Sequence, residues 1–238
     1  MPVISFANAK GGAGKTTAAL LLATELAHQG FRITIIDADP QRWISQWQET
    51  SGKVRNIEVI SEVTVASLNG HLREMASVTD YFIIDLAGAR DALVTTALGL
   101  SDHVFIPVQG SAMDAKGAAQ ILDILALLKE KAKLDIDHSV VLTRVASMVT
   151  TKALLAIKGL LAAKGVNVMT APIGERSAFK ELFEMGGTLH TMDPTKVSNL
   201  DKAKENARAY AVEVLRLMPV KMTRSAVSRL IGLGRGIN

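Results

Sequence analysis

Two lysines bracket a run of glycines near the start of the chain, in the stretch FANAKGGAGKTT at residues 6–17. The glycines lie between a short apolar run and a longer run rich in alanine and leucine, so we expect a strand, a turn and a helix in that order. Glycines let the backbone approach an anion closely, and the N-terminus of the following helix adds positive charge. The pattern predicts a phosphate-binding loop, with an ordinary glycine turn before a helix as the alternative.

The residues of this loop have expected tasks. Lys15 would reach the outer phosphates of a nucleotide, and the Thr16 hydroxyl would hold Mg²⁺. The phosphates would be bound by the whole stretch, which comprises Gly11, Gly12, Ala13, Gly14, Lys15, Thr16 and Thr17. A phosphate loop needs one lysine, so the pattern alone gives the second lysine, Lys10, no task.

Three aspartates at the ends of predicted strands could complete a metal site. Asp37 and Asp39 occur in IIDADPQ, and Asp85 ends the apolar run of YFIIDLAG. Ligand sites in open parallel sheets form at the carboxyl ends of the strands, so all three side chains would meet the glycine loop. Asp85 suits the water shell of Mg²⁺, and a helix cap or a solvated strand end is the alternative for any single aspartate.

A regular scaffold must bring these residues together. Short β-rich runs alternate with longer helical patterns, and several runs are apolar nearly throughout, as expected of strands covered on both faces. The alternation predicts an α/β fold with a doubly wound, mostly parallel sheet flanked by helices. We expect strands at residues 3–7, 32–37, 57–61, 81–85, 103–108, 138–145 and 166–170. We expect helices at residues 15–30, 113–133, 151–165 and 194–217.

Composition excludes several classes of protein. The 238 residues contain no cysteine, which rules out disulfides, thiolate metal sites and cysteine-ligated iron–sulfur clusters. The N-terminus lacks the features of a signal peptide, and no apolar run reaches the ~20 residues that a membrane span needs. We therefore expect a cytoplasmic protein. Trp43 and Trp47, four residues apart on a helix expected after Pro40, are interpreted as packing residues, with a partner-binding face as the alternative.

Positive charge is concentrated at the C-terminus. Residues 214–238 contain five basic residues and no acid, whereas the rest of the chain has 22 basic residues against 23 acidic ones. Pro219 would separate an ATPase domain of residues 1–218 from a basic tail of residues 219–238. Wound as a helix, the tail is amphipathic, which is typical of a segment that binds anionic lipid, contacts DNA phosphates or docks on its own domain.

Three motifs together, KGGAGKTT, DADPQ and FIIDLAG, resemble those of the deviant Walker-A ATPases, a group of ParA-type partition proteins and MinD-type division-site proteins. The resemblance implies a P-loop NTPase that binds ATP and Mg²⁺ and hydrolyses ATP. It also gives Lys10 a task. In this family the lysine before the glycines reaches across a nucleotide-sandwich homodimer to the phosphates held by the other subunit, and a solvated loop lysine is the alternative here.

The same resemblance implies roles for other residues. Asp39 matches the switch-I aspartate, which positions the attacking water and joins the Mg²⁺ shell beside Thr16 and Asp85. Residues 85–90 match switch II, which senses the γ-phosphate, although many relatives have a proline where Ala87 stands. The adenine would be contacted by Thr143, Arg144, Pro172 and Ile173, although many relatives carry an asparagine where Thr143 stands.

The resemblance favours a partition ATPase. The chain begins almost at the glycine loop, so we expect no N-terminal helix-turn-helix domain and a likeness to the short ParA forms, with VirC-type proteins as a close variant. Such dimers bind DNA without sequence preference, which implies association with the nucleoid in the ATP state. No arginine finger is evident in the sequence, so we expect slow turnover that awaits a stimulating, ParB-like partner.

Other functions remain open at this point. The chief alternative is a MinD-like positioning ATPase that acts at a membrane through the tail. A metabolic enzyme on the same fold, such as a carboxylate–amine ligase, is a third possibility, and nitrogenase-reductase-like chemistry is disfavoured because the cluster cysteine is missing. The residues expected to contact DNA or lipid are Arg176, Lys221, Arg224, Arg229 and Arg235.

Overall fold

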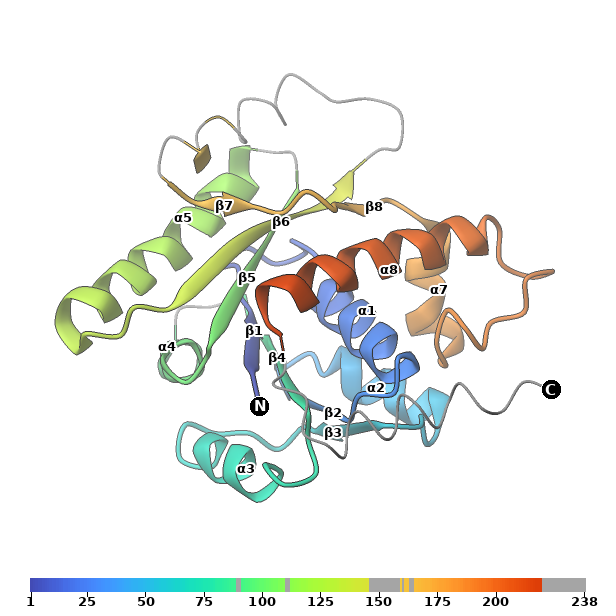
Figure 1. The fold of residues 1–238 in the computed structure, drawn as a ribbon, viewed down its shortest axis with the longest axis horizontal. Helices are drawn as coiled ribbons and strands as arrows, with labels where there is room; N and C mark the ends of the chain where they lie inside the picture. Colours follow the sequence, from blue (N-terminus) through green and yellow to red (C-terminus); the bar gives the residue numbers. More distant parts are fainter. Residues whose placement is uncertain (89–90, 110–111, 146–158, 160, 163–164, 220–238) are drawn as a thin grey trace.

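The structure is a computed structural model of the chain, and it describes residues 1–88, 91–109, 112–145, 159, 161–162 and 165–219 (Figure 1). Most of the predicted helix at 151–165 and nearly all of the basic tail lie outside these described residues. Within them, no helix is both long and apolar enough to cross a lipid bilayer.

An eight-stranded sheet forms the centre of the molecule, and every strand pairing in it is parallel. The strand order is β3-β2-β4-β1-β5-β6-β7, with β8 paired to β6. The strands are β1 (Val3–Phe6), β2 (Ile33–Ala38), β3 (Ile57–Ile60), β4 (Tyr81–Leu86), β5 (His103–Val108), β6 (Asp137–Val145), β7 (Asn167–Val168) and β8 (Ile173–Gly174). The prediction of a doubly wound parallel sheet is confirmed, and the two-residue strand β8 is an addition that the sequence did not indicate.

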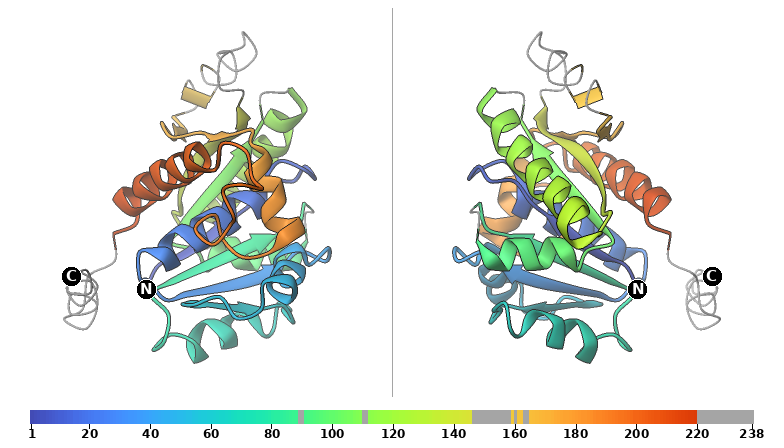
Figure 2. Two further views of the ribbon diagram at one scale, coloured as in Figure 1. Left: turned by 90° about the vertical axis from the view of Figure 1, so that its right-hand side faces the viewer. Right: turned by 90° about the vertical axis from the view of Figure 1, so that its left-hand side faces the viewer.

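Helices cover both faces of the sheet (Figures 1 and 2). One core contains the buried sides of α1 (Lys15–His28), α2 (Trp43–Ser51), α7 (Ser177–Met185) and α8 (Leu200–Leu217). The other core contains those of α3 (Leu68–Glu74), α4 (Ala92–Gly99) and α5 (Ala112–Leu127). Because β1, β2, β4 and β5 are buried between these layers, most of their residues are apolar on both sides of the sheet.

Helix α1 is the central helix of its layer. All residues from Ala18 to Ala27 are buried, because α1 packs between the sheet and α8. That position explains why the segment is apolar around its whole circumference rather than along one stripe. Trp47 is also buried and its Nε1 donates to Gly187 O at 2.9 Å, as expected of a packing residue. The same expectation for Trp43 is wrong, since 47% of that residue is exposed.

Two predicted helices have different ends in the structure. The segment 194–217 becomes helical only from Leu200, because Asn199 before it has a left-handed backbone with φ of 52°. The segment 113–133 forms α5 and then a single π-helical turn at Leu128–Ala132. Beyond α8, the Tyr81 hydroxyl donates to Met218 O at 2.9 Å and fastens the end of this helix to β4.

Candidate nucleotide-binding site

The glycine loop joins β1 to α1 at the carboxyl edge of the sheet. Gly12 and Gly14 have φ of 76° and 94°, values that residues with a Cβ rarely adopt, so glycine is required at both positions. Gly14 is the N-cap residue of α1, and no side chain caps the helix there. The first N–H groups of α1 therefore lack a side-chain acceptor and can bind an anion.

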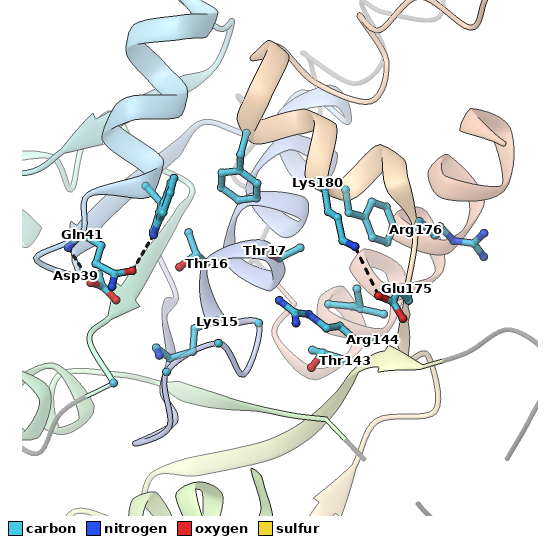
Figure 3. Close-up of a pocket in the computed structure, with 18 of the residues that line it drawn as sticks. Lys15, Thr16, Thr17, Asp39, Gln41, Thr143, Arg144, Glu175, Arg176 and Lys180 are labelled. Carbon is cyan, nitrogen blue, oxygen red and sulfur yellow. Dashed lines mark hydrogen bonds and ion pairs between the residues drawn. The ribbon is translucent and has the colours of Figure 1, made fainter. Parts of the chain in front are cut away.

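A cavity of about 870 Å³ opens beside this loop (Figure 3). Figure 3 shows Lys15 and Thr16 in its middle, Asp39 and Gln41 on one side, and Thr143 and Arg144 on the other. The lining residues are Gly11, Gly12, Gly14, Lys15, Thr16, Thr17, Asp39, Gln41, Trp43, Gly88, Thr143, Arg144, Ile173, Gly174, Glu175, Arg176, Phe179, Lys180, Phe183 and Glu184. A cavity of this size accommodates a nucleotide.

A buried lysine and two buried aspartates lie under the loop. Asp37 of β2 and Asp85 of β4 are paired in register, and both are almost fully buried. Burial lowers the pKa of Lys15, while the carboxylates of Asp85 and Asp39 oppose that shift. Burial also raises the pKa of Asp85 to about 7, and the Asp37 carboxylate adds to the shift, whereas the nearby Thr16 hydroxyl and Lys15 oppose it.

The two buried aspartates have unused acceptor atoms. Asp37 Oδ2 accepts from Ser45 N at 2.9 Å and from Ser45 Oγ at 2.6 Å, but Asp37 Oδ1 has no partner with hydrogen-bond geometry in the described part of the chain. The same is true of both carboxylate oxygens of Asp85. Buried oxygens without donors are destabilising unless a ligand supplies the donors. The waters around Mg²⁺ would supply them, so these residues fit a magnesium ion beside Thr16.

Asp39 belongs to the turn between β2 and α2, where it is partly exposed. Its Oδ1 accepts from Gln41 N at 2.9 Å, and Gln41 Oε1 accepts from Trp43 Nε1 at 2.8 Å. These contacts fix the turn that presents the carboxylate to the cavity. Trp43 is therefore part of the cavity wall, which explains why it is not packed in the core.

The segment predicted to surround the adenine is divided in the structure. Arg144 and Ile173 line the cavity, whereas Pro172 is not among the described residues that line it. The Thr143 hydroxyl donates to Ala13 O at 2.8 Å, so its hydrogen bond is made to the phosphate loop. A direct contact of Thr143 with a base stays a prediction. Arg144 has a left-handed backbone with φ of 51°, a strained conformation of the kind found at functional sites.

Helix α8 holds that segment in place through two side chains that the sequence analysis missed. Asn206 Oδ1 accepts from Gly174 N at 2.8 Å, and Asn206 Nδ2 donates to Pro172 O at 2.7 Å. Glu213 accepts from Thr170 N and Ala171 N at 2.8 and 2.6 Å. Neither residue lies in a recognisable motif, because the contacts join positions more than 30 residues apart in the chain.

Lys10 lies just outside the cavity lining, on the turn before the glycines, and is partly exposed. Its backbone N–H donates to Asn8 Oδ1 at 2.8 Å. From the end of β5, Gln109 Nε2 donates to Gly12 O. Asn8 and Gln109 were also missed. Asn8 is wholly buried, which the sequence does not show; its place two residues before Lys10 is the signal that could have drawn attention to it.

Of the residues predicted to contact DNA or lipid, the structure describes only Arg176. Arg176 lines the cavity, and its Nε donates to Asn206 Oδ1 at 3.5 Å. Lys221, Arg224, Arg229 and Arg235 lie outside the described residues, as do Ala89 and Arg90 of the expected switch-II segment.

Comparisons with known proteins agree with this geometry. The VirC1 protein family matches residues 1–223. The chain is 37% identical over 216 residues to Protein ParA of Rhizobium radiobacter, which covers 91% of this chain and 97% of that protein. A McdA variant from Cyanothece in complex with ATP has a TM-score of 0.70 at 19% identity, covering 90% of this chain and 96% of that one. The MinD cell division protein of Aquifex aeolicus has a TM-score of 0.68 at 19% identity, and the match covers 94% of this chain and 99% of that one.

Proposed function

The chain belongs to the VirC1 family of ParA/MinD-type P-loop ATPases, and we propose that it is an ATP-dependent, dimerising switch ATPase that partitions plasmid or chromosomal DNA. The observation that carries the proposal is the group under the glycine loop. Lys15 is buried there beside carboxylate oxygens that lack donors, an arrangement stabilised by a phosphate chain and its metal.

Each residue of the site then has a chemical task. The α1 N-terminus and Lys15 bind the β- and γ-phosphates, and the Thr16 hydroxyl and Asp85 hold the metal. Mg²⁺, when bound, neutralises the charge of the phosphates. Asp39 stands at the partly exposed side of the cavity, where it can accept a hydrogen bond from the attacking water and orient it.

Lys10 acts from the other subunit in this proposal. It lies beside the loop rather than in the cavity lining, so its position suits a contact with a second copy placed across the cavity mouth. A second cation near the γ-phosphate would stabilise the charge of the transition state only when two subunits meet. ATP binding and dimerisation thereby become one linked equilibrium.

The ATP-bound dimer would bind DNA without sequence preference. The excess of positive charge at the C-terminus and the family membership support this assignment. We further propose that a partner protein of the ParB type stimulates the slow hydrolysis, since no arginine finger is evident in the sequence. The protein would then be cytoplasmic, and bound to the nucleoid in its ATP state.

A second candidate is a MinD-like positioning ATPase, which the amphipathic, basic sequence of residues 220–233 favours. The decisive experiment compares ATPase activity and co-sedimentation with duplex DNA and with vesicles of anionic phospholipid. We expect ATP-dependent binding to duplexes of unrelated sequence that falls steeply with salt, and no ATP-dependent binding to vesicles.

Lys15→Ala is the control for nucleotide dependence in that experiment. Truncation after Met218 separates the tail from the folded domain. Binding to vesicles but not to DNA would replace the partition function by the positioning function. Absence of ATP hydrolysis under all conditions would contradict both.

A further inference from the structure

Helix α5 packs a glycine against the turn that carries Lys10. Gly117 is buried in the second turn of α5, and a methyl group added to it would overlap Asn8 Oδ1. The same methyl group would lie 3.0 Å from Lys10 N and 3.0 Å from Lys10 Cβ. The helix therefore touches the backbone and the root of the side chain of the lysine that the proposed function places in trans.

Asn8 cannot move aside freely to make room. It is wholly buried, its Nδ2 donates to Pro107 O at 2.7 Å, and its Oδ1 accepts from Lys10 N at 2.8 Å. Asn8 thus ties the Lys10 backbone to the end of β5. Breaking either hydrogen bond would leave a polar atom of the buried Asn8 without a partner, which destabilises the fold.

A second glycine contacts the same stretch of backbone. A methyl group at Gly88, in the loop after β4, would lie 3.2 Å from Gly11 N and 3.3 Å from Lys10 C. The backbone of Lys10 is therefore approached closely at its N by Gly117 and at its carbonyl carbon by Gly88, two segments distant from it in sequence. Contacts this tight leave the backbone at Lys10 little freedom.

We propose that Asn8 and Gly117 are positioning residues that set the direction in which Lys10 leaves the phosphate loop. This inference rests on the proposed function, because the readout is the dimer that forms with ATP. A glycine in the middle of a helix destabilises it relative to alanine. Gly117 therefore carries a cost in the helix, and the close approach of Asn8 and Lys10 is what requires the absence of a side chain.

The test is a comparison of two helical glycines. Gly117→Ala places a methyl group against Asn8 and Lys10, whereas Gly70→Ala in α3 is a matched control, because nothing lies within 4 Å of the added group. Nucleotide affinity is measured by titration of the monomer, and dimerisation by sedimentation velocity with Mg²⁺ and a non-hydrolysable ATP analogue. The thermal midpoint of each variant reports whether it is folded.

We expect Gly117→Ala to weaken dimerisation about tenfold or more, since a displaced Lys10 would lose its charged contact with the phosphates of the other subunit. Its affinity for the analogue should stay within about twofold of the parent value, because the residues that bind phosphate in cis are not touched. Gly70→Ala should behave like the parent protein in both measurements. A Gly117→Ala protein that dimerises normally, or that loses nucleotide affinity as much as dimerisation, would overturn the inference.

A second variant keeps the inference testable if Gly117→Ala does not fold. Asn8→Ala removes the acceptor of the Lys10 N–H, and it should also weaken dimerisation more than nucleotide binding. In the double variant the overlap with Asn8 is gone, so Gly117→Ala should weaken dimerisation less than it does in the parent background. Additive effects, or an Asn8→Ala protein that dimerises normally, would contradict positioning. A parent protein that stays monomeric with the analogue would instead refute the proposed function.

Discussion

Buried polar side chains at the two ends of the central sheet differ in whether they have hydrogen-bond partners. At the amino ends of β5 and β6, Nε2 of the buried His103 lies 3.0 Å from Oγ of the buried Ser139, and Nδ2 of the exposed Asn167 in β7 donates to the same Ser139 Oγ at 2.8 Å. Each of these polar side chains has a partner within the protein. At the carboxyl ends of β2 and β4, Asp85 has no hydrogen-bond partner among the described residues, and Asp37 uses only one of its oxygens.

We infer from this difference that the paired groups at the amino end stabilise the fold, whereas the unpaired carboxylate oxygens at the carboxyl end are available to a ligand. A buried network whose members are all paired stabilises one arrangement of the core, whereas an unpaired buried carboxylate destabilises it. The fold tolerates the cost at one end because the bound nucleotide and metal would remove it. Variants at the two ends should therefore have opposite effects on stability and separable effects on function.

The largest expected effect is on nucleotide binding at the carboxyl end. Lys15→Ala removes a buried cation that we propose contacts the phosphates, so ATP binding should weaken by about 3–5 kcal/mol. Isothermal titration with the non-hydrolysable analogue measures the loss. An affinity within threefold of the parent value would show that Lys15 does not contact the phosphates.

Asp39 should affect turnover rather than affinity. Asp39→Ala removes the group that we propose orients the attacking water, so the rate of hydrolysis should fall about a hundredfold. The variant should still bind ATP and accumulate as an ATP-bound dimer. Steady-state release of phosphate and sedimentation test the two parts, and unchanged phosphate release would exclude the assigned role.

Stability at the carboxyl end should rise when the unpaired charge is removed. The pKa of Asp85 is about 7 in the folded protein and near 3.8 when it is unfolded, so the protein without nucleotide loses stability as pH rises through that window. Asp85→Asn should be more stable than the parent by about 2 kcal/mol at pH 8, and this gain should shrink as pH falls toward 4. Urea unfolding in EDTA measures it, and a destabilised Asp85→Asn protein at pH 8 would contradict the comparison.

The amino end should show the opposite dependence on pH, with a smaller effect. Burial lowers the pKa of His103 to about 4, below its usual value of 6.5, so the stability that the neutral ring provides is lost as pH falls through that window. His103→Asn should be less stable than the parent by about 1–2 kcal/mol at pH 7, and the gap should narrow below pH 6. Nucleotide affinity should not change, and a loss of affinity would show that the two ends are not independent.

The sequence was sufficient for the parts of the molecule that depend on local pattern. Apolar runs predicted strands β1 to β6 because most of their residues are covered on both faces of the sheet, and the segment predicted at 166–170 contains the two-residue strand β7. The positions of Lys15 and Thr16 followed from the glycines, because only one strand–turn–helix geometry suits them. Trp43 was misjudged because a tryptophan in an amphipathic helix can face a core or a cavity, and the spacing does not distinguish these.

The remaining residues depend on contacts between distant segments. Asn206 donates to and accepts from residues more than 30 positions away in the chain. Gly117 packs against Asn8, which is more than 100 positions away. An asparagine in a helix and a glycine in a helix carry no local signal of such a partner. The left-handed backbone at Arg144 and Asn199 is likewise set by tertiary structure, since nothing in the neighbouring sequence requires it.

The central claim is that ATP joins two copies of the chain through Lys10. It is tested most directly by sedimentation velocity of the parent, Lys10→Ala and Lys15→Ala proteins with Mg²⁺ and the non-hydrolysable analogue. The parent should sediment as a dimer, and Lys10→Ala should bind the analogue but remain monomeric, because its cis contacts to phosphate are intact. Lys15→Ala should neither bind nor dimerise. A Lys10→Ala protein that forms the dimer at parent concentrations would contradict the claim.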